Sequence, residues 1–218
     1  GYREAAAGIR PADGASIELA RKRQDTLTKP PGSLGRLEET AIRLAGMARR
    51  CSPPIPRRKS ILLFAGDHGV VAQGVSAFPP EVTAQMVTNI LRGGAAISVL
   101  SRRIGARLVV VDAGVAAELP PLEGLRQEKI APGTADMSVG SAMGREQAEA
   151  ALDLGVRIAT GEMDRGVDVI ACGEMGIGNT TSASAIVSLL TGRSPSDLTG
   201  PGTGLAAGGV SHKADVIS

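Results

Sequence analysis

Three short apolar stretches constrain the fold of this 218-residue chain more than any other feature of its sequence. They lie at Ser60–Ala65, Leu108–Asp112 and Val167–Ala171. Their apolar residues follow one another almost without interruption, which is typical of strands buried on both faces. A glycine-containing loop follows each stretch, and a segment with helical spacing comes after the loop. This order predicts an α/β fold with a parallel sheet.

Apolar residues three and four positions apart predict the helices that accompany these strands. The predicted helices are Pro80–Arg92, Ala95–Ile104 and Arg145–Glu162. Together with the strands they predict a three-layer, Rossmann-like sheet with helices on both faces. Ligands of such sheets bind beyond the carboxyl ends of the strands. The loops after Ala65, Asp112 and Ala171 are therefore candidate binding loops.

The residues before the first apolar stretch have a different pattern. Helical spacing within residues 13–50 predicts a helical hairpin, and its turn is Lys29–Glu38, where two prolines and a glycine interrupt the helix. Ser52–Arg58 contains three prolines and is interpreted as a linker. We expect a small helical N-terminal domain at 1–58 and an α/β nucleotide-binding domain at 59–218. A helix predicted from Val210 runs to the last residue, so we expect this domain to be incomplete at its C-terminus.

The composition argues against several classes of partner. Tyr2, Phe64 and Phe78 are the only Phe, Tyr or Trp residues, so nucleic-acid bases would find little to stack on. The net charge is only +2, from 24 basic and 22 acidic residues. No apolar stretch approaches the roughly 20 residues that cross a bilayer. Cys51 and Cys172 are not in a CxxC pair, which argues against a thiolate zinc site. We expect a cytoplasmic protein with neither a nucleic-acid nor a membrane partner.

The loop after the third stretch is predicted to bind an anion. Its glycines, Gly173, Gly176 and Gly178, keep side chains away from the backbone. Thr180 or Thr181 is expected to cap the next helix, whose N-terminus attracts phosphate. The spacing nearly matches a Walker A loop, but Asn179 occupies the position of its lysine. The pattern therefore predicts a phosphate site and disfavours a P-loop nucleoside triphosphatase.

Asp67 and His68 directly follow the first stretch, and their role stays open between holding the loop in shape and contacting a ligand. A metal site would require His68, His212 and scattered carboxylates to converge, and no ligand spacing indicates one. No metal and no cofactor are expected.

Four motifs resemble one known family. They are KPPGSLGRLE (residues 29–38), AGDHGVVAQGVSAFPPEVTAQM (65–86), GEMGIGNTTSASA (173–185) and GPGTGL (200–205). In this order and spacing they are similar to the nicotinate-nucleotide:dimethylbenzimidazole phosphoribosyltransferases of cobalamin biosynthesis, from about Ala20 to the last residue. The resemblance implies a glycosyltransferase that moves the phosphoribosyl group of nicotinate mononucleotide to 5,6-dimethylbenzimidazole. The products would be α-ribazole phosphate and nicotinate, and the enzyme would be a homodimer.

The resemblance also implies site residues. The ribose phosphate would be held by Gly176, Gly178, Asn179, Thr180, Gly202, Thr203 and Lys213. The benzimidazole would lie against Phe78, Met86 and Met175. Glu174 would lie beside the ribose or the incoming base as a supporting catalytic residue. Lys213 would supply the cation that the Walker-like loop lacks.

One departure from the family leaves two functions open. The family's general base is a glutamate in an RLGEG-type segment, and this sequence contains no such segment. We therefore expect little turnover from this C-terminally truncated chain. The first hypothesis is the transferase, and the second is a non-catalytic module that binds a mononucleotide or a benzimidazole. Diphosphate-dependent phosphoribosyltransferases carry a pair of acidic residues before a Thr-Gly loop. This chain lacks such a pair, since Ala113 and Gly114 follow Asp112, so that class of enzyme fits poorly.

Overall fold

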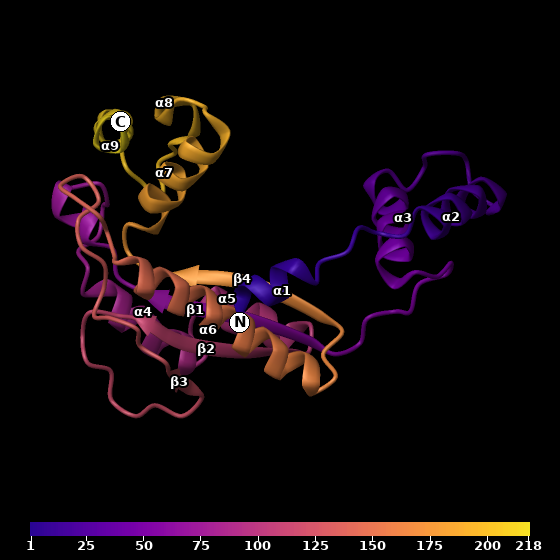
Figure 1. Cartoon of the computed structure of the whole chain (residues 1–218), viewed down its shortest axis with the longest axis horizontal. Helices are drawn as coiled ribbons and strands as arrows, with labels where there is room; N and C mark the ends of the chain where they lie inside the picture. The colour runs from indigo at the N-terminus through magenta and orange to yellow at the C-terminus, as the bar shows by residue number, and fades with distance from the viewer. The chain divides into compact units, whose positions relative to one another are not determined.

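The computed structural model describes residues 1–218, which form two compact units, Gly1–Arg57 and Arg58–Ser218 (Figure 1). The first unit contains α1 (Tyr2–Ala7), α2 (Gly14–Thr26) and α3 (Arg36–Ala48). Asp13 caps α2, because its Oδ2 accepts a hydrogen bond of 2.8 Å from the backbone N–H of Ser16. The α2 and α3 helices pack together and bury Ala20 and Ala45, which confirms the predicted hairpin.

The second unit is built on a four-stranded parallel sheet. Its strands are β1 (Lys59–Gly66), β2 (Ala106–Gly114), β3 (Leu125–Gln127) and β4 (Val169–Met175), in the order β3-β2-β1-β4. The predicted α/β class with a parallel sheet is confirmed. The third predicted strand was placed too early: β4 starts at Val169 and continues to Met175. Glu174 therefore lies on a strand, in register with Phe64 of β1, rather than in the following loop.

Helices cover both faces of this sheet. Leu63 and Val110 face α4 (Val82–Leu91) and α5 (Ala96–Arg103), and pack with Val87 and Ile90 of α4. Leu62 and Val111 face the opposite side, where they pack against Leu154 and Ile158 of α6 (Arg145–Asp164). Neighbouring residues on one strand point to opposite faces, so each strand is buried on both sides. This burial explains the continuous apolar stretches of the sequence.

The order of the strands fixes where a ligand can bind. From β1 the chain passes through α4 and α5 to β2, and from β3 it returns through α6 to β4 on the other side of β1. The carboxyl ends of β1 and β4 therefore form the point at which the strand order reverses, where ligands of open α/β sheets bind.

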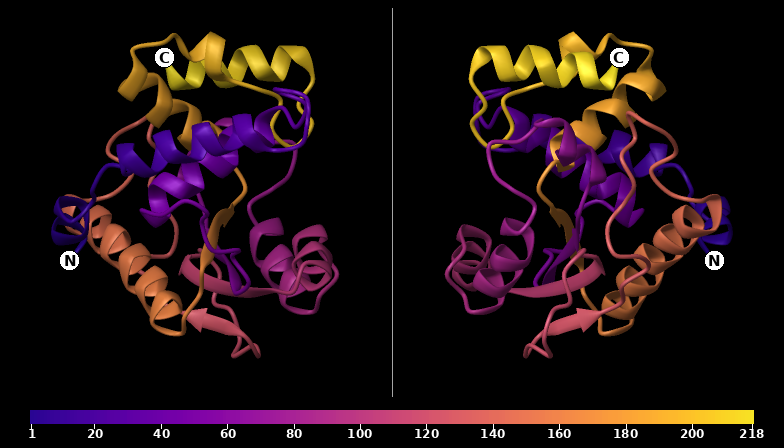
Figure 2. Two further views of the ribbon diagram at one scale, coloured as in Figure 1. Left: turned by 90° about the vertical axis from the view of Figure 1, so that its right-hand side faces the viewer. Right: turned by 90° about the vertical axis from the view of Figure 1, so that its left-hand side faces the viewer.

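Short helices follow these carboxyl ends. The 3-10 helix η1 (Gly69–Gln73) follows β1, and α7 (Asn179–Thr191) follows β4. Next come α8 (Pro195–Leu198) and α9 (Ala207–Ile217), and α7, α8 and α9 contact one another (Figure 2).

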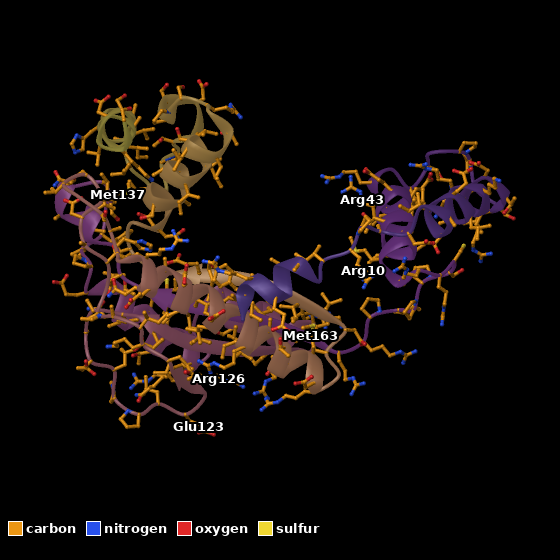
Figure 3. The ribbon with its side chains drawn as sticks, viewed as in Figure 1. Arg10, Arg43, Glu123, Arg126, Met137 and Met163 are labelled. Atoms are coloured by element: carbon orange, nitrogen blue, oxygen red, sulfur yellow. The ribbon has the colours of Figure 1, made fainter.

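The opposite end of the sheet is held by the buried carboxylate of Glu162, near the C-terminus of α6. Ser60 donates a hydrogen bond of 2.7 Å to Glu162 Oε2. Guanidinium groups of Arg107 on β2, Arg126 on β3 and Arg165 pair with the same carboxylate. Arg126 is labelled in Figure 3. One side chain thus links α6 to three strands.

None of the helices is long and apolar enough to cross a membrane.

Candidate functional site

The loop between β4 and α7 is shaped by two glycines. Gly178 has a φ of +89°, a left-handed conformation that glycine adopts readily, and a Cβ at this position would lie 2.5 Å from Val71 Cγ2. Gly176 lies so close to the carbonyl oxygen of Gly66 and the carboxylate of Glu174 that no side chain fits there. Both positions therefore require glycine, and the backbone of the loop stays open to a ligand.

The start of α7 differs from the prediction. Gly178 is the N-cap residue and makes no side-chain cap, so neither Thr180 nor Thr181 caps the helix. The Thr180 Oγ1 instead accepts a hydrogen bond of 2.6 Å from Lys213 Nζ. The hydroxyl of Thr181 is buried without a hydrogen-bond partner. The helix N-terminus is therefore left without a competing side-chain oxygen.

All seven residues predicted to hold the phosphate line one cavity of about 40 Å³. They come from the β4–α7 loop, the first turn of α7, the loop after α8 and the α9 helix. The members are Gly176, Gly178, Asn179, Thr180, Gly202, Thr203 and Lys213. Residues as far apart as Gly176 and Lys213 thus meet around a space of small-anion size.

Lys213 is the only cationic side chain of this cavity, and it is 1% exposed. Its ammonium group donates to Thr180 and, at 3.4 Å, to the carbonyl oxygen of Gly200. No carboxylate pairs with it, and burial lowers the pKa of Lys213. An unpaired buried ammonium is costly, and a bound anion would offset that cost.

The helix that carries Lys213 is anchored by the preceding residue. His212 Nε2 lies 2.6 Å from the backbone oxygen of Gln73 at the end of η1. The Gln73 side chain in turn donates a hydrogen bond of 2.6 Å to Asp136. These contacts tie α9 to the loops that follow β1 and β3, which keeps the ammonium of Lys213 at the cavity.

Glu174 and His68 lie next to the phosphate loop. Glu174 Oε1 is 3.3 Å from His68 Nε2, and His68 Nδ1 is 3.0 Å from Ser182 Oγ on α7. Burial raises the pKa of Glu174, and Asp67 adds to this, while the hydrogen bond and charge of His68 act in the opposite direction. The carboxylate is thus prepared to accept a proton more readily than an exposed glutamate.

A larger cavity of about 200 Å³ adjoins Glu174 on the α6 face of the sheet. Its lining is mostly apolar, with Phe64 from β1, Ile130 from the loop after β3 and Met143 from the loop before α6. Asp67, His68, Thr134, Gln147 and Glu174 supply its polar side chains.

The contacts of Asp67 support the suggestion that it holds its loop in shape, and contact of Asp67 or His68 with a ligand stays a prediction. The Asp67 Oδ2 accepts a hydrogen bond of 2.8 Å from the backbone N–H of Ala116, so it holds two loops together. The Asp67 Oδ1 is buried and has no hydrogen-bond partner. His68 contacts Glu174 rather than a metal ligand set, and no three His, Cys, Asp or Glu side chains are grouped to hold a metal ion.

The three residues predicted to contact the benzimidazole do not line the larger cavity. Met86 and Met175 are partly buried and pack against the core of the α4 face, while Phe78 is 47% exposed in the loop before α4. Sequence reasoning did not identify Ser182, Gln147 or Met143 as site residues. Their positions depend on α6 and α7, so no local motif marks them.

The chain is similar to known phosphoribosyltransferases in sequence and in structure. The profile of a family described as phosphoribosyltransferase (DBI_PRT) matches residues 9–218. The nicotinate-nucleotide–dimethylbenzimidazole phosphoribosyltransferase of Chloroflexus aurantiacus is 53% identical over 96% of this chain and 59% of its own length. The protein of the same name from a Roseiflexus species is 50% identical over 98% of this chain and 60% of its own.

Among solved structures, CobT from Thermus thermophilus superposes with a TM-score of 0.88 at 45% identity. The match covers 93% of this chain and 61% of that chain. The chain therefore spans about three fifths of the length of the relatives that it matches.

Proposed function

The chain belongs to the phosphoribosyltransferase family whose curated members include nicotinate-nucleotide–dimethylbenzimidazole phosphoribosyltransferases, and on this premise we propose that it takes part in the same transfer. In this reaction the phosphoribosyl group of nicotinate mononucleotide passes to a ring nitrogen of 5,6-dimethylbenzimidazole. One C–N bond at the anomeric carbon breaks and another forms, and the proton on the second nitrogen of the base is lost. The products are nicotinate and α-ribazole phosphate.

The phosphate cavity carries this proposal. A mononucleotide presents one phosphate, and the cavity combines the open backbone of the β4–α7 loop, the N-terminus of α7 and the ammonium of Lys213. Helix N-termini and buried ammonium groups both favour a phosphate. The cavity contains no carboxylate that would repel the anion.

The chemistry of the leaving group fits the lack of an obvious general acid. The pyridine nitrogen of nicotinate mononucleotide is already cationic, so nicotinate leaves without receiving a proton. What the reaction requires is a fixed phosphate, an ordered ring and a carboxylate near the proton of the base. We assign Glu174 as a supporting carboxylate, because it adjoins Gly176 of the phosphate loop and burial raises its pKa.

The predicted base contacts, Phe78, Met86 and Met175, and the predicted cytoplasmic homodimer remain proposals drawn from the family resemblance. Sedimentation equilibrium would test the dimer. The second candidate function, a binding module without turnover, shares every contact of the phosphate cavity. Release of nicotinate only when both substrates are present would favour the transferase, whereas binding without release would favour the module.

Calorimetric titration with nicotinate mononucleotide tests the phosphate assignment. We expect the Lys213→Ala variant to bind it about 10- to 100-fold more weakly, because a hydrogen bond from a charged donor is lost. Nicotinate riboside, which lacks the phosphate, should bind both proteins weakly and equally. Equal affinity of the two proteins for the mononucleotide would refute the assignment.

A further inference from the structure

The hydroxyl group of Ser182 makes its contact outside its own helix. Hydroxyl groups within helices commonly donate to the carbonyl oxygen four residues earlier, as Thr191 on α7 and Ser211 on α9 do in this chain. Ser182 Oγ lies instead 3.0 Å from Nδ1 of His68, in the loop after β1. The two residues are 114 positions apart, so tertiary packing rather than the helix itself directs this hydroxyl.

Close packing of α7 against the loop after β1 makes this contact possible. Gly178 and Ser182 are four positions apart, so they lie on the same side at the start of the helix. A Cβ at Gly178 would lie 3.4 Å from His68 Cβ and 2.5 Å from Val71 Cγ2. The absence of a side chain at Gly178 thus brings α7 close enough for Ser182 to contact the imidazole.

The two partners of His68 determine which ring nitrogen carries the hydrogen. An ionised carboxylate only accepts hydrogen bonds, so His68 Nε2, which is 3.3 Å from Glu174 Oε1, must carry the hydrogen. In a neutral imidazole Nδ1 is then an acceptor, and the Ser182 hydroxyl donates to it. The side chains of His68 and Glu174 are 17% and 34% exposed, so water replaces these contacts only in part.

Few other charges act on this chain of hydrogen bonds. Asp67, which precedes His68, is the other charged side chain that affects Glu174, and it raises the pKa of that carboxyl group. The α7 helix contains no charged residue. Thr134 and Gln147, which line the adjoining cavity, are neutral. The orientation of the imidazole therefore depends on Ser182 on one side and on Glu174 on the other.

We propose that Ser182 is a positioning residue for Glu174 and that it acts through His68. Its hydroxyl holds the imidazole with Nε2 toward Glu174 Oε1, which leaves Oε2 for contact with a ligand. The hydrogen bond from His68 favours the ionised carboxylate, which is the form that can accept a proton. That this carboxylate serves the phosphoribosyl transfer rests on the proposed function.

Carbon NMR of the 218-residue chain, labelled at the glutamate carboxyl group, tests the proposal. Ser182→Ala should shift the titration of Glu174 to higher pH, in the same direction as His68→Ala but by less, because the imidazole remains and is held less well. Ser182→Ala added to His68→Ala should cause no further shift, since the residue through which Ser182 acts is absent. A further shift in the double variant, or none in Ser182→Ala, would overturn the inference.

Nitrogen NMR of labelled histidine gives a second readout, which needs no variant. The chain has only two histidines, so the signals of His68 and His212 are readily assigned. Above the pH range in which histidine is protonated, we expect His68 with its hydrogen on Nε2 and with Nδ1 as a hydrogen-bonded acceptor. Ser182→Ala should move the Nδ1 signal to that of an acceptor without a donor. His212, which contacts Gln73, is the internal reference. A hydrogen on Nδ1 in the unaltered protein would contradict the proposal.

Two variants on the same helix separate positioning from packing. Ser182→Thr keeps a hydroxyl group and should retain both the Glu174 titration and the Nδ1 signal of the unaltered protein. Ser184→Ala removes a hydroxyl that donates a hydrogen bond of 3.2 Å to the carbonyl oxygen of Leu198, so it should lose stability without changing either readout. If Ser184→Ala shifted the Glu174 titration as far as Ser182→Ala, the effect would not depend on His68 and the inference would fail.

Failure of this inference is distinguishable from failure of the proposed function. Neither Ser182 nor His68 lines the phosphate cavity, so the Lys213→Ala titration with nicotinate mononucleotide is independent of both residues. An unchanged Glu174 titration in Ser182→Ala, together with normal binding of the mononucleotide, would refute the positioning role alone. Loss of the phosphate assignment would leave the Ser182 and His68 readouts as they are.

Discussion

Glu174 Oε1 lies 3.3 Å from His68 Nε2. Glu174 lines the larger cavity and adjoins Gly176, which lines the phosphate cavity. Glu174 lies on β4, and His68 lies two residues beyond the end of the neighbouring strand β1. The other imidazole nitrogen contacts Ser182 on α7, so the ring is held from both sides. His68 thus fixes the orientation of Glu174 and modifies its protonation.

The first prediction concerns the protonation of Glu174. Burial and Asp67 raise its pKa, and His68 lowers it. Replacement of His68 by Ala removes the lowering contribution, so the Glu174 carboxyl should titrate at a higher pH than in the unaltered protein. Carbon NMR of chains labelled at the glutamate carboxyl group measures this shift, with Glu174→Gln to assign the signal. A shift to lower pH, or none, would contradict the assigned role of His68.

The pH dependence of stability follows from the same pKa. When folding raises the pKa of a carboxyl group, the folded protein is destabilised at any pH above the pKa that the group has in the unfolded chain. This destabilisation disappears as the pH falls below that unfolded pKa. Glu174→Gln should therefore melt at a higher temperature than the unaltered protein near pH 7. The difference should vanish in acid below the ordinary glutamate range. Circular dichroism is the suitable probe, since the chain contains no tryptophan.

The second prediction separates stability from binding at Lys213. Its ammonium group is buried without a carboxylate partner, so Lys213→Met should leave the free protein equally or more stable. The same variant should bind inorganic phosphate at least about 10-fold more weakly. Thermal melts with and without phosphate measure both effects, and Lys22→Met, at an exposed position, is the control. A large loss of stability in the absence of phosphate would show that Lys213 is mainly structural.

The sequence was sufficient to predict the sheet because each strand is buried on both faces. Leu62 and Leu63 face opposite helix layers, so the apolar stretch of β1 has no polar alternation. The three residues of β3, Leu125–Gln127, are too few for a pattern and were not predicted. The end of β4 was missed because Gly173 and Glu174 are unusual in a strand; they pair with Leu63 and Phe64 across the sheet.

The candidate site was predictable where glycines mark it. Gly176 and Gly178 are required by local conformation and close contacts, and these requirements are visible as a spacing in the sequence. The contact between His68 and Ser182 joins residues 114 positions apart, and no local pattern marks it. The unpaired oxygen of Asp67 likewise depends on Ala116 taking the other oxygen, which only the folded structure shows.

The third prediction tests the loop that closes over the phosphate cavity. Gly202 has a φ of +55°, and a Cβ there would lie 2.9 Å from Thr180 Oγ1 and 3.3 Å from Lys213 Nζ. Gly202→Ala should therefore weaken binding of nicotinate mononucleotide by about 10-fold or more, because the ammonium is displaced. Gly192→Ala is the matched control: its φ is +69°, and nothing lies within 4 Å of the added carbon. Both variants should lose stability through backbone strain, but only Gly202→Ala should lose affinity.

The fourth prediction concerns the end of the sheet far from the site. Glu162 is fully buried, accepts a hydrogen bond from Ser60 and pairs with three arginines that are 30–54% exposed. Glu162→Ala leaves the buried Ser60 hydroxyl without its acceptor, while the arginines can turn toward water. We expect a loss of about 1–3 kcal/mol in the free energy of unfolding.

Urea unfolding followed by circular dichroism measures this loss. Glu162→Gln keeps an acceptor for Ser60 and should lose less, so the difference between the two variants isolates the buried hydroxyl. Glu39→Ala removes an exposed pair with Arg43 on α3 and should change the free energy by less than about 0.5 kcal/mol. If Glu162→Ala lost no more free energy of unfolding than Glu39→Ala, the Glu162 carboxylate would not stabilise the packing of α6 on the sheet. Affinity for nicotinate mononucleotide should be unchanged in folded Glu162→Ala, because this carboxylate lines neither cavity.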